Sequence, residues 1–377
     1  MHSTLPLQQE PPEQRPAPAA DRPRDGGPGS RLAALDGLRL LAALMVVAYH
    51  YLAFDSGAWD GPAREVFPVA HLPASYGWLG VQLFFLISGF VICMSCWGKS
   101  AGEFALARVA RLYPAYWFAV LAVALVVRLW PVVSDAPALR NVAVNLTMLQ
   151  DPLGVEPVDG VYWTLWVELR FYLLFALVVH RGLTYRRAVG FCVAWAFAAV
   201  IAEASGNGTL TQILMPHHCW YFIAGIAFYL MHRFRPNPAL WLLVAGSLLI
   251  AQHDLLRAQA SAEGHMGHQV PQWPTAVLVT LFFLAVMAIA LGWTRRANWR
   301  WLPAAGALTY PLYLLHERIG WTVIKGADGH VPRWVLLPCL VAAMLLAAWA
   351  VHRWVERPLA GKVKHGMRRA AREIRNG

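Results

Sequence analysis

The chain has 377 residues, of which 58% are hydrophobic and only 14% are charged, and its mean hydropathy is +0.44. A soluble domain is nearer half apolar and a quarter charged, so this composition excludes an ordinary soluble protein and indicates a membrane protein. The net charge of +11 does not indicate nucleic-acid binding, because the basic residues form short clusters between apolar runs and no nucleic-acid-binding motif accompanies them.

The chain begins with a stretch that is rich in Pro, Gly, Ala, Arg and Asp and has no apolar periodicity. Such a segment cannot bury enough apolar surface to fold, so we expect residues 1–30 to form a disordered tail. A cleaved signal peptide is not expected, because its apolar run would lie close to the N-terminus.

Ten apolar runs follow, most of them of about 17 to 23 residues, which is long enough to cross a hydrocarbon core of ~30 Å as a helix. They lie near 32–54, 76–96, 113–130, 163–179, 188–203, 214–231, 239–253, 274–292, 304–323 and 334–352. The stretch 141–149 is too short to span and is expected to be interfacial or re-entrant. The sequence therefore predicts an all-α transmembrane bundle of about ten helices. The membrane domain covers 31–357, and a basic cytoplasmic tail follows at 358–377.

The connections between these runs alternate in charge. One set holds eleven Lys and Arg in 42 residues, and the other holds five in 93 residues. The basic set consists of 97–112, 180–187, 232–238 and 293–303. Since cytoplasmic connections carry the excess of Lys and Arg, both termini are expected in the cytoplasm, in agreement with an even number of spans. The high Arg and Ala content fits a GC-rich bacterium, so we expect the bacterial inner membrane.

The first apolar run contains two ionisable residues that share one helical face. Arg39 and His50 are 11 residues apart, which is three turns plus about 20°, or about 16 Å along the axis. Asp36 lies on the same stripe. An ionisable group at membrane depth is costly and is a candidate functional residue. Snorkelling of the arginine and capping of the helix by the histidine are the structural alternatives.

The fourth run presents Glu168 and Tyr172 on one face, at a depth similar to that of His50. A carboxylate beside an imidazole fixes its tautomer and stabilises its protonated form, so Glu168 is expected to orient His50. A structural salt bridge of Glu168 with Arg170 or a neighbouring span is the alternative. In the ninth run, His316, Glu317 and Arg318 are consecutive and cannot all face lipid, so some line a cavity or a helix contact.

Two further groups are candidate binding residues. The second run contains Gly77, Gly80, Ser88 and Gly89, small residues that allow close helix packing, with Ser88 kept as a candidate substrate-binding residue. Arg108 and Arg111 are spaced to hold a phosphate between them, although topology alone also explains them.

No metal site is expected. The side chains of His217 and His218 diverge on a helix, and no further ligand cluster accompanies them. The five cysteines lie in or beside apolar runs and are expected to pack as small hydrophobic residues. Dinucleotide, phosphate-loop and G-x-S-x-G motifs are absent from the sequence.

Six segments, in this order, resemble the membrane acyltransferases of acyltransferase family three. They are LDGLRLLAALMVVAYH, GVQLFFLISGFVI, RVARLYPAYW, WTLWVELRFY, TYPLYLLH and VERP. The resemblance covers about residues 31–360. Arg170 departs from it, since many members carry an acidic residue or Gln there. We also expect no secreted hydrolase-like domain of the kind that some members append.

The resemblance implies transfer of an acyl group, expected to be acetyl, from acyl-CoA as co-substrate to a hydroxyl of a carbohydrate or glycoside. Catalytic roles are implied for His50, Glu168 and Arg39. Donor-binding roles are implied for Arg39, Arg108 and Arg111, and substrate-binding roles for Tyr172 and His316. The expected partners are acyl-CoA, the acceptor glycan and membrane lipid.

We expect His50 to act as a general base that takes the proton of the acceptor hydroxyl, with a covalent acyl-histidine as the alternative route. A transporter or flippase that uses intramembrane His, Glu and Arg is the alternative from another functional class.

Overall fold

The computed structural model describes residues 32–294, 296–297 and 299–376, so the expected disordered tail at 1–30 lies outside the described residues. All the regular elements of the described part are helical. The longer helices are α1 (Ala33–Leu52), α4 (Gly80–Cys96), α5 (Ala101–Leu129), α7 (Trp163–His180), α8 (Tyr185–Ser205), α10 (Cys219–Arg233), α11 (Pro238–Met266), α12 (Trp273–Ala290), α13 (Leu302–Ala327), α14 (Arg333–Val351) and α15 (Arg357–Asn376). The short ones are α2 (Ala63–Val66), α3 (His71–Ala74), η2 (Gly77–Leu79), α6 (Leu139–Asn145), η3 (Gly160–Tyr162), α9 (Gly208–Leu214) and the π-helical turn η4 (His352–Glu356).

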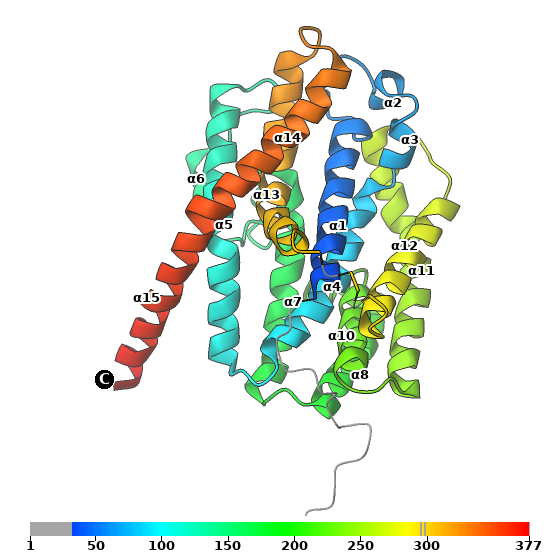
Figure 1. Cartoon of the computed structure of the whole chain (residues 1–377), viewed down its shortest axis with the longest axis vertical. Helices are drawn as coiled ribbons and strands as arrows, with labels where there is room; N and C mark the ends of the chain where they lie inside the picture. Colours follow the sequence, from blue (N-terminus) through cyan, green and yellow to red (C-terminus); the bar gives the residue numbers. More distant parts are fainter. Residues whose placement is uncertain (1–31, 295, 298, 377) are drawn as a thin grey trace, which may run out of the picture.

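The predicted all-α bundle is confirmed. Within the described residues, nine helical stretches are long and apolar enough to cross a membrane. The run predicted at 304–323 corresponds to α13, which is not one of the nine because its consecutive polar residues, 316–318, lower its hydropathy. It nevertheless lies within the bundle, where it packs against α1, α5 and α14 (Figure 1).

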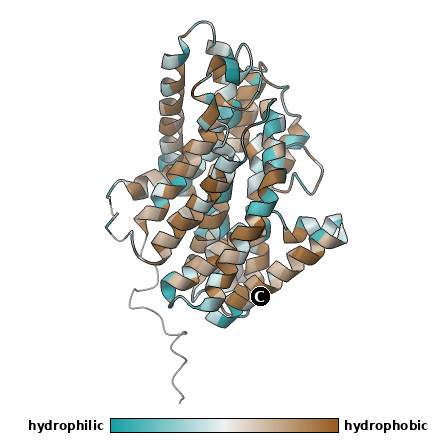
Figure 2. Cartoon of the chain, turned by 90° about the vertical axis from the view of Figure 1, so that its right-hand side faces the viewer, coloured by the Kyte–Doolittle hydropathy of each residue, from teal (hydrophilic) through white to brown (hydrophobic). Residues whose placement is uncertain are grey.

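The outer surface of the bundle is apolar. Figure 2 shows hydrophobic residues along the middle of the long helices and hydrophilic residues mainly in the connections. Several large apolar side chains are more than half exposed, among them Leu125, Leu177, Phe197, Leu249 and Leu346. Exposure on this scale fits a surface covered by lipid tails rather than by water. The chain is an integral membrane protein.

Close packing of α4 against α10 depends on two glycines. A Cβ atom on Gly89 would lie 2.3 Å from the backbone oxygen of Phe222, and one on Gly225 would lie 2.2 Å from that of Leu86. The two backbones therefore touch, which is the role of small residues at helix contacts in membranes. Gly89 fills the packing role that the sequence predicted for the small residues of this run.

The connections separate into two ends of the bundle. Helices α2 and α3 and the connection from α13 to α14 lie at the top of Figure 1, and the connection from α4 to α5 lies at the bottom. The stretch expected to be interfacial contains the short helix α6 and turns. At the other end of the chain, α15 continues the direction of α14 and leaves the bundle toward the lower left (Figure 1), so the segment after 358 begins inside a helix.

Candidate active site

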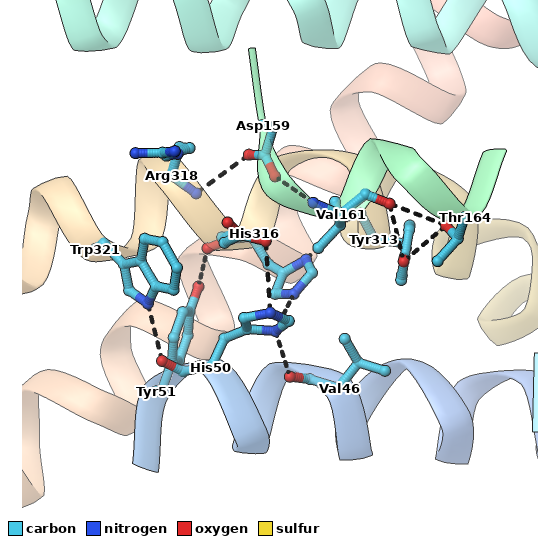
Figure 3. A network of polar contacts seen from close by, with 11 residues as sticks. Val46, His50, Tyr51, Asp159, Val161, Thr164, Tyr313, His316, Arg318 and Trp321 are labelled. Carbon is cyan, nitrogen blue, oxygen red and sulfur yellow. Dashed lines mark hydrogen bonds and ion pairs between the residues drawn. The ribbon is translucent and has the colours of Figure 1, made fainter. Parts of the chain in front are cut away.

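The best-defined polar cluster of the bundle lies where α1 meets α13 (Figure 3). His50 Nδ1 is 2.9 Å from the carbonyl oxygen of Val46, and His316 Nδ1 is 2.8 Å from that of Tyr313. Because a carbonyl oxygen only accepts, each Nδ1 carries the proton of its neutral ring. His316 Nε2 then accepts from the same N–H of His50, at 3.1 Å. These contacts leave Nε2 of His50 unprotonated and able to act as a base.

A carboxylate stands next to this nitrogen. Glu317 Oε2 is 3.4 Å from His50 Nε2, and the Glu317 side chain is only 5% exposed. Glu317 also accepts hydrogen bonds from the backbone N–H groups of Gly160 and Val161. A carboxylate held in this place stabilises an imidazolium once Nε2 has taken up a proton. The geometry is that of a histidine base with an acidic partner.

The segment before α7 fixes this carboxylate from the opposite side. A Cβ atom on Gly160 would lie 2.5 Å from Glu317 Oε1, so only glycine leaves room for the carboxylate here. Asp159 accepts hydrogen bonds from the backbone N–H groups of Val161 and Arg318, both at 3.2 Å. Burial raises the pKa of Asp159 to about 6, and these two hydrogen bonds oppose the increase. The loop is thereby fastened to α13 at the level of the histidines.

His50 and Glu317 line a cavity of about 520 Å³, which we call the histidine cavity. Its wall also contains Trp78, Trp163 and His218. The volume is within the usual range for a small-molecule site.

A second, smaller space of about 90 Å³, the central cavity, contains most of the other candidate residues. Its lining includes Arg39, Ser88, Arg108, Glu168 and Tyr172. The Ser88 hydroxyl donates to Glu168 Oε1, and the Tyr172 ring lies 6.0 Å from the Arg108 guanidinium. Arg108 Nε is buried and has no hydrogen-bond partner among the described residues. The structure thus brings together five candidate residues from α1, α4, α5 and α7.

Glu168 does not contact His50, contrary to the expectation that it would orient the imidazole. Its hydrogen-bond donor is Ser88, and the two groups next to the His50 ring nitrogens are His316 and Glu317. The reason is the packing order: α13 is the principal helix against α1, whereas Glu168 on α7 faces α4.

A third space of about 770 Å³, the arginine cavity, lies next to the central one. Its lining includes five arginines and one carboxylate: Arg39, Arg111, Arg300, Arg353, Arg357 and Asp36. Arg111 also forms an ion pair with Glu356. The expected pair Arg108 and Arg111 is therefore divided between two adjacent cavities. Such a concentration of guanidinium groups suits a ligand with several phosphates.

The three cavities are neighbours in series. Arg39 lines both the arginine and the central cavity, and Tyr313 lines both the central and the histidine cavity. The face of α1 that carries Arg39 and His50 therefore borders all three cavities.

Sequence reasoning did not assign roles to Glu317, Asp159 or Gly160. Glu317 had a visible signal, because it lies in a run of three polar residues inside an apolar segment. Asp159 and Gly160 precede a span and resemble ordinary turn residues, so their contact with α13 was not visible in the sequence.

A histidine base with a carboxylate partner, set inside a helical bundle beside an arginine-lined cavity, defines a membrane-embedded group-transfer enzyme. The chain belongs to the acyltransferase 3 family, whose model, described as an acyltransferase domain, matches residues 32–353. It is 26% identical to Nodulation protein 10 of Rhizobium leguminosarum bv. viciae over 363 residues, which cover 86% of this chain and 92% of the relative. It is also 26% identical to Acyltransferase MdmB of Streptomyces mycarofaciens over 374 residues, which cover 87% of this chain and 91% of the relative. No solved structure gives a significant match. The chain is a membrane acyltransferase that transfers groups other than aminoacyl groups.

Proposed function

We propose that this membrane acyltransferase moves an acyl group, most simply acetyl, from acyl-CoA to a hydroxyl of a carbohydrate or glycoside. The observation that carries the proposal is the series of three cavities, which leads from five arginines to Nε2 of His50. One end is suited to a polyphosphorylated donor, and the other contains the base. The similarity to a protein named Acyltransferase MdmB supports the same class of reaction.

The donor is assigned to the arginine cavity on electrostatic grounds. Coenzyme A carries a diphosphate and a further phosphate, and this lining holds five guanidinium groups against one carboxylate. Planar guanidinium groups bind phosphate bidentately and stay charged at every physiological pH. Arg39, at the boundary with the central cavity, is assigned to the phosphate nearest the pantetheine arm.

The thioester arm is assigned to the central cavity. Arg39 and His50 are separated by about 16 Å of helix axis, a gap that an extended arm bridges between the phosphates and the base. Ser88, Glu168 and Tyr172 supply polar groups for the amides of the arm. Glu168 thus acts on the donor in this proposal and not on the imidazole.

Transfer takes place at the boundary of the histidine cavity. Nε2 of His50 removes the proton of the acceptor hydroxyl as its oxygen attacks the thioester carbonyl. The carbon–sulfur bond then breaks, and the CoA thiolate takes the proton from the imidazolium. Glu317 stabilises the positive charge during this interval, and His316 keeps the opposite ring nitrogen in place. Every proton that leaves the acceptor is returned to the leaving thiol.

The orientation follows from the distribution of charge. The basic connections and the arginine cavity are assigned to the cytoplasm, where acyl-CoA is made, with both termini on the same side. The membrane is the inner membrane of a bacterium. The histidine cavity then opens toward the outer half of the bilayer.

The test uses membranes containing the protein, labelled acetyl-CoA and a glycan extract of the host. Alkali-labile label in the glycan fraction is measured for the wild type and for His50→Ala, with His180→Ala as the control because His180 is exposed at the end of α7. We expect equal labelling in wild type and control and a loss of at least roughly 100-fold in His50→Ala.

Three outcomes change the assignment. Label that appears only with succinyl-CoA or a longer acyl-CoA changes the donor and keeps the reaction. Undiminished label in His50→Ala removes the histidine mechanism. Uptake or flipping of a substrate without ester formation supports the transporter alternative.

A further inference from the structure

The last membrane helix contains an irregular turn beside the arginine cavity. At the end of α14, the backbone N–H of Arg357 donates to the carbonyl oxygen of His352, five residues back, and this bond closes the π-helical turn η4. Single π turns within long helices are rare and are frequently found at functional sites. His352, Arg353 and Arg357 line the arginine cavity, whereas Glu356 lies outside its lining, with a side chain that is only 5% exposed.

Each carboxylate oxygen of Glu356 has its own basic partner. Oε1 accepts from the guanidinium group of Arg111 on α5, and Oε2 lies 2.8 Å from Nδ1 of His352. A buried carboxylate is costly unless it is paired, so the burial of Glu356 favours both contacts. Both partners line the arginine cavity. Glu356 therefore connects α5 to the last membrane helix from behind the wall of this cavity.

An aromatic ring holds Arg111 on another side. The guanidinium carbon of Arg111 lies 5.7 Å from the centre of the Tyr310 ring, and the Tyr310 hydroxyl donates to the carbonyl oxygen of Leu112 at 3.1 Å. A guanidinium group has five N–H donors in a fixed fork, and the contact with Glu356 is made by one terminal nitrogen. The carboxylate and the ring thus fix the group while other donors remain for a phosphate.

We propose that Glu356 is a positioning residue of the donor site, which holds Arg111 and His352 in the orientation that binds the phosphates of acyl-CoA. The inference rests on the proposed function, since that function assigns the donor to the arginine cavity. Glu356 acts through its two partners and does not touch the donor. A side chain that is already ordered loses less freedom when a ligand binds, and we expect this gain to outweigh the negative charge that Glu356 adds behind the wall.

The binding test uses the purified full chain in nanodiscs, with CoA titrated by calorimetry. Glu356→Gln keeps the size of the side chain and removes its charge, and should weaken CoA binding about tenfold because Arg111 and His352 lose the group that orients them. Glu356→Asp keeps the charge and should bind CoA within about threefold of the wild type. Glu103→Gln is the matched control and should bind CoA like the wild type, since Glu103 is an exposed residue of α5 outside the lining of the arginine cavity.

A double variant tests whether Glu356 acts through Arg111. In an Arg111→Gln background, the further change Glu356→Gln should weaken CoA binding by about threefold or less, because the principal partner of Glu356 is already lost. Neither member of the ion pair is left unpaired in this double variant, so it provides the comparison even where Glu356→Gln alone fails to insert. A further tenfold loss in this background would show that Glu356 acts independently of Arg111, and would overturn the inference.

Initial rates of transfer from labelled acetyl-CoA provide a second measurement on the same samples. Glu356→Gln should raise the KM for acyl-CoA about tenfold and leave kcat and the KM for the acceptor within about twofold of the wild type, whereas general damage to the structure would lower kcat. CoA binding by Glu356→Gln that equals or exceeds that of the wild type, or a lower kcat at unchanged KM, overturns the inference and leaves the proposed function intact. CoA binding that is weakened as expected, without ester formation by the wild type, keeps the inference and removes the proposed reaction. Absence of CoA binding by the wild type removes both.

Discussion

Gly160→Ala should slow acyl transfer while leaving the bundle folded, because the added methyl group reaches the partner of the catalytic histidine. The new Cβ would lie 2.5 Å from Glu317 Oε1, whereas an ordinary carbon–oxygen contact is about 3.3 Å or longer. The atom that must yield is the end of a flexible side chain and not backbone. Glu317 is therefore displaced by about 1 Å from the η3 backbone, which changes its position relative to His50.

The size of the effect follows from this displacement. A misplacement of about 1 Å in an active site costs up to roughly 100-fold in rate. We expect kcat to fall by about 10- to 100-fold, which corresponds to about 1.4–2.7 kcal/mol in activation free energy. The KM for acyl-CoA should change little, because the arginine cavity is not touched. The assay is initial-rate transfer of labelled acetyl to a saturating acceptor, normalised to the amount of inserted protein.

Gly190→Ala is the matched control, since Gly190 lies in α8 and a Cβ atom there would meet nothing within 4 Å. It should retain wild-type kcat and KM. Wild-type kcat in a correctly inserted Gly160→Ala protein would refute the role assigned to Glu317. Loss of insertion in Gly160→Ala alone would show that the glycine serves folding, and it would contradict the expectation of an intact bundle.

Three further variants test other parts of the reasoning. Arg39→Gln should raise the KM for acyl-CoA by about tenfold and leave the KM for the acceptor unchanged, because it removes one phosphate partner. An equal rise in the KM for the acceptor would contradict this assignment. His316→Ala should lower kcat by roughly tenfold and leave residual activity, since the Val46 carbonyl still holds the His50 tautomer; complete inactivity would show a direct chemical role. Gly89→Ala should reduce the amount of folded protein in membranes, as its Cβ would lie 2.3 Å from a backbone oxygen of α10, and normal accumulation would refute the backbone contact.

The fold was largely predictable because the membrane restricts the possible structures. Apolar runs of sufficient length must become helices in lipid, and this rule located the spans from composition alone. The run at 304–323 was recognised despite its charges, because the residues before and after His316 are apolar. The described part of the chain bears out the helices, while the orientation stays a prediction.

The site was predictable only within single helices. The shared face of Arg39 and His50 is a consequence of 3.6 residues per turn, and both residues do line the cavities along α1. Contacts between helices depend on packing order, which helical periodicity does not encode. The sequence therefore placed Glu168 beside the wrong partner, and it gave no reason to connect Gly160 with Glu317.

The arrangement also explains why a histidine base is placed at the junction of α1 and α13. A base in an apolar interior needs its tautomer fixed, and Val46 and Tyr313 do this with carbonyls of their own helices, so no additional charge is introduced. The acidic partner, Glu317, is in turn held by the backbone N–H groups of Gly160 and Val161, with the Arg318 guanidinium also acting on it. In the proposed reaction, the five arginines of the arginine cavity hold the phosphates of acyl-CoA at one end, and the axial separation of Arg39 and His50 sets how far the thioester must reach.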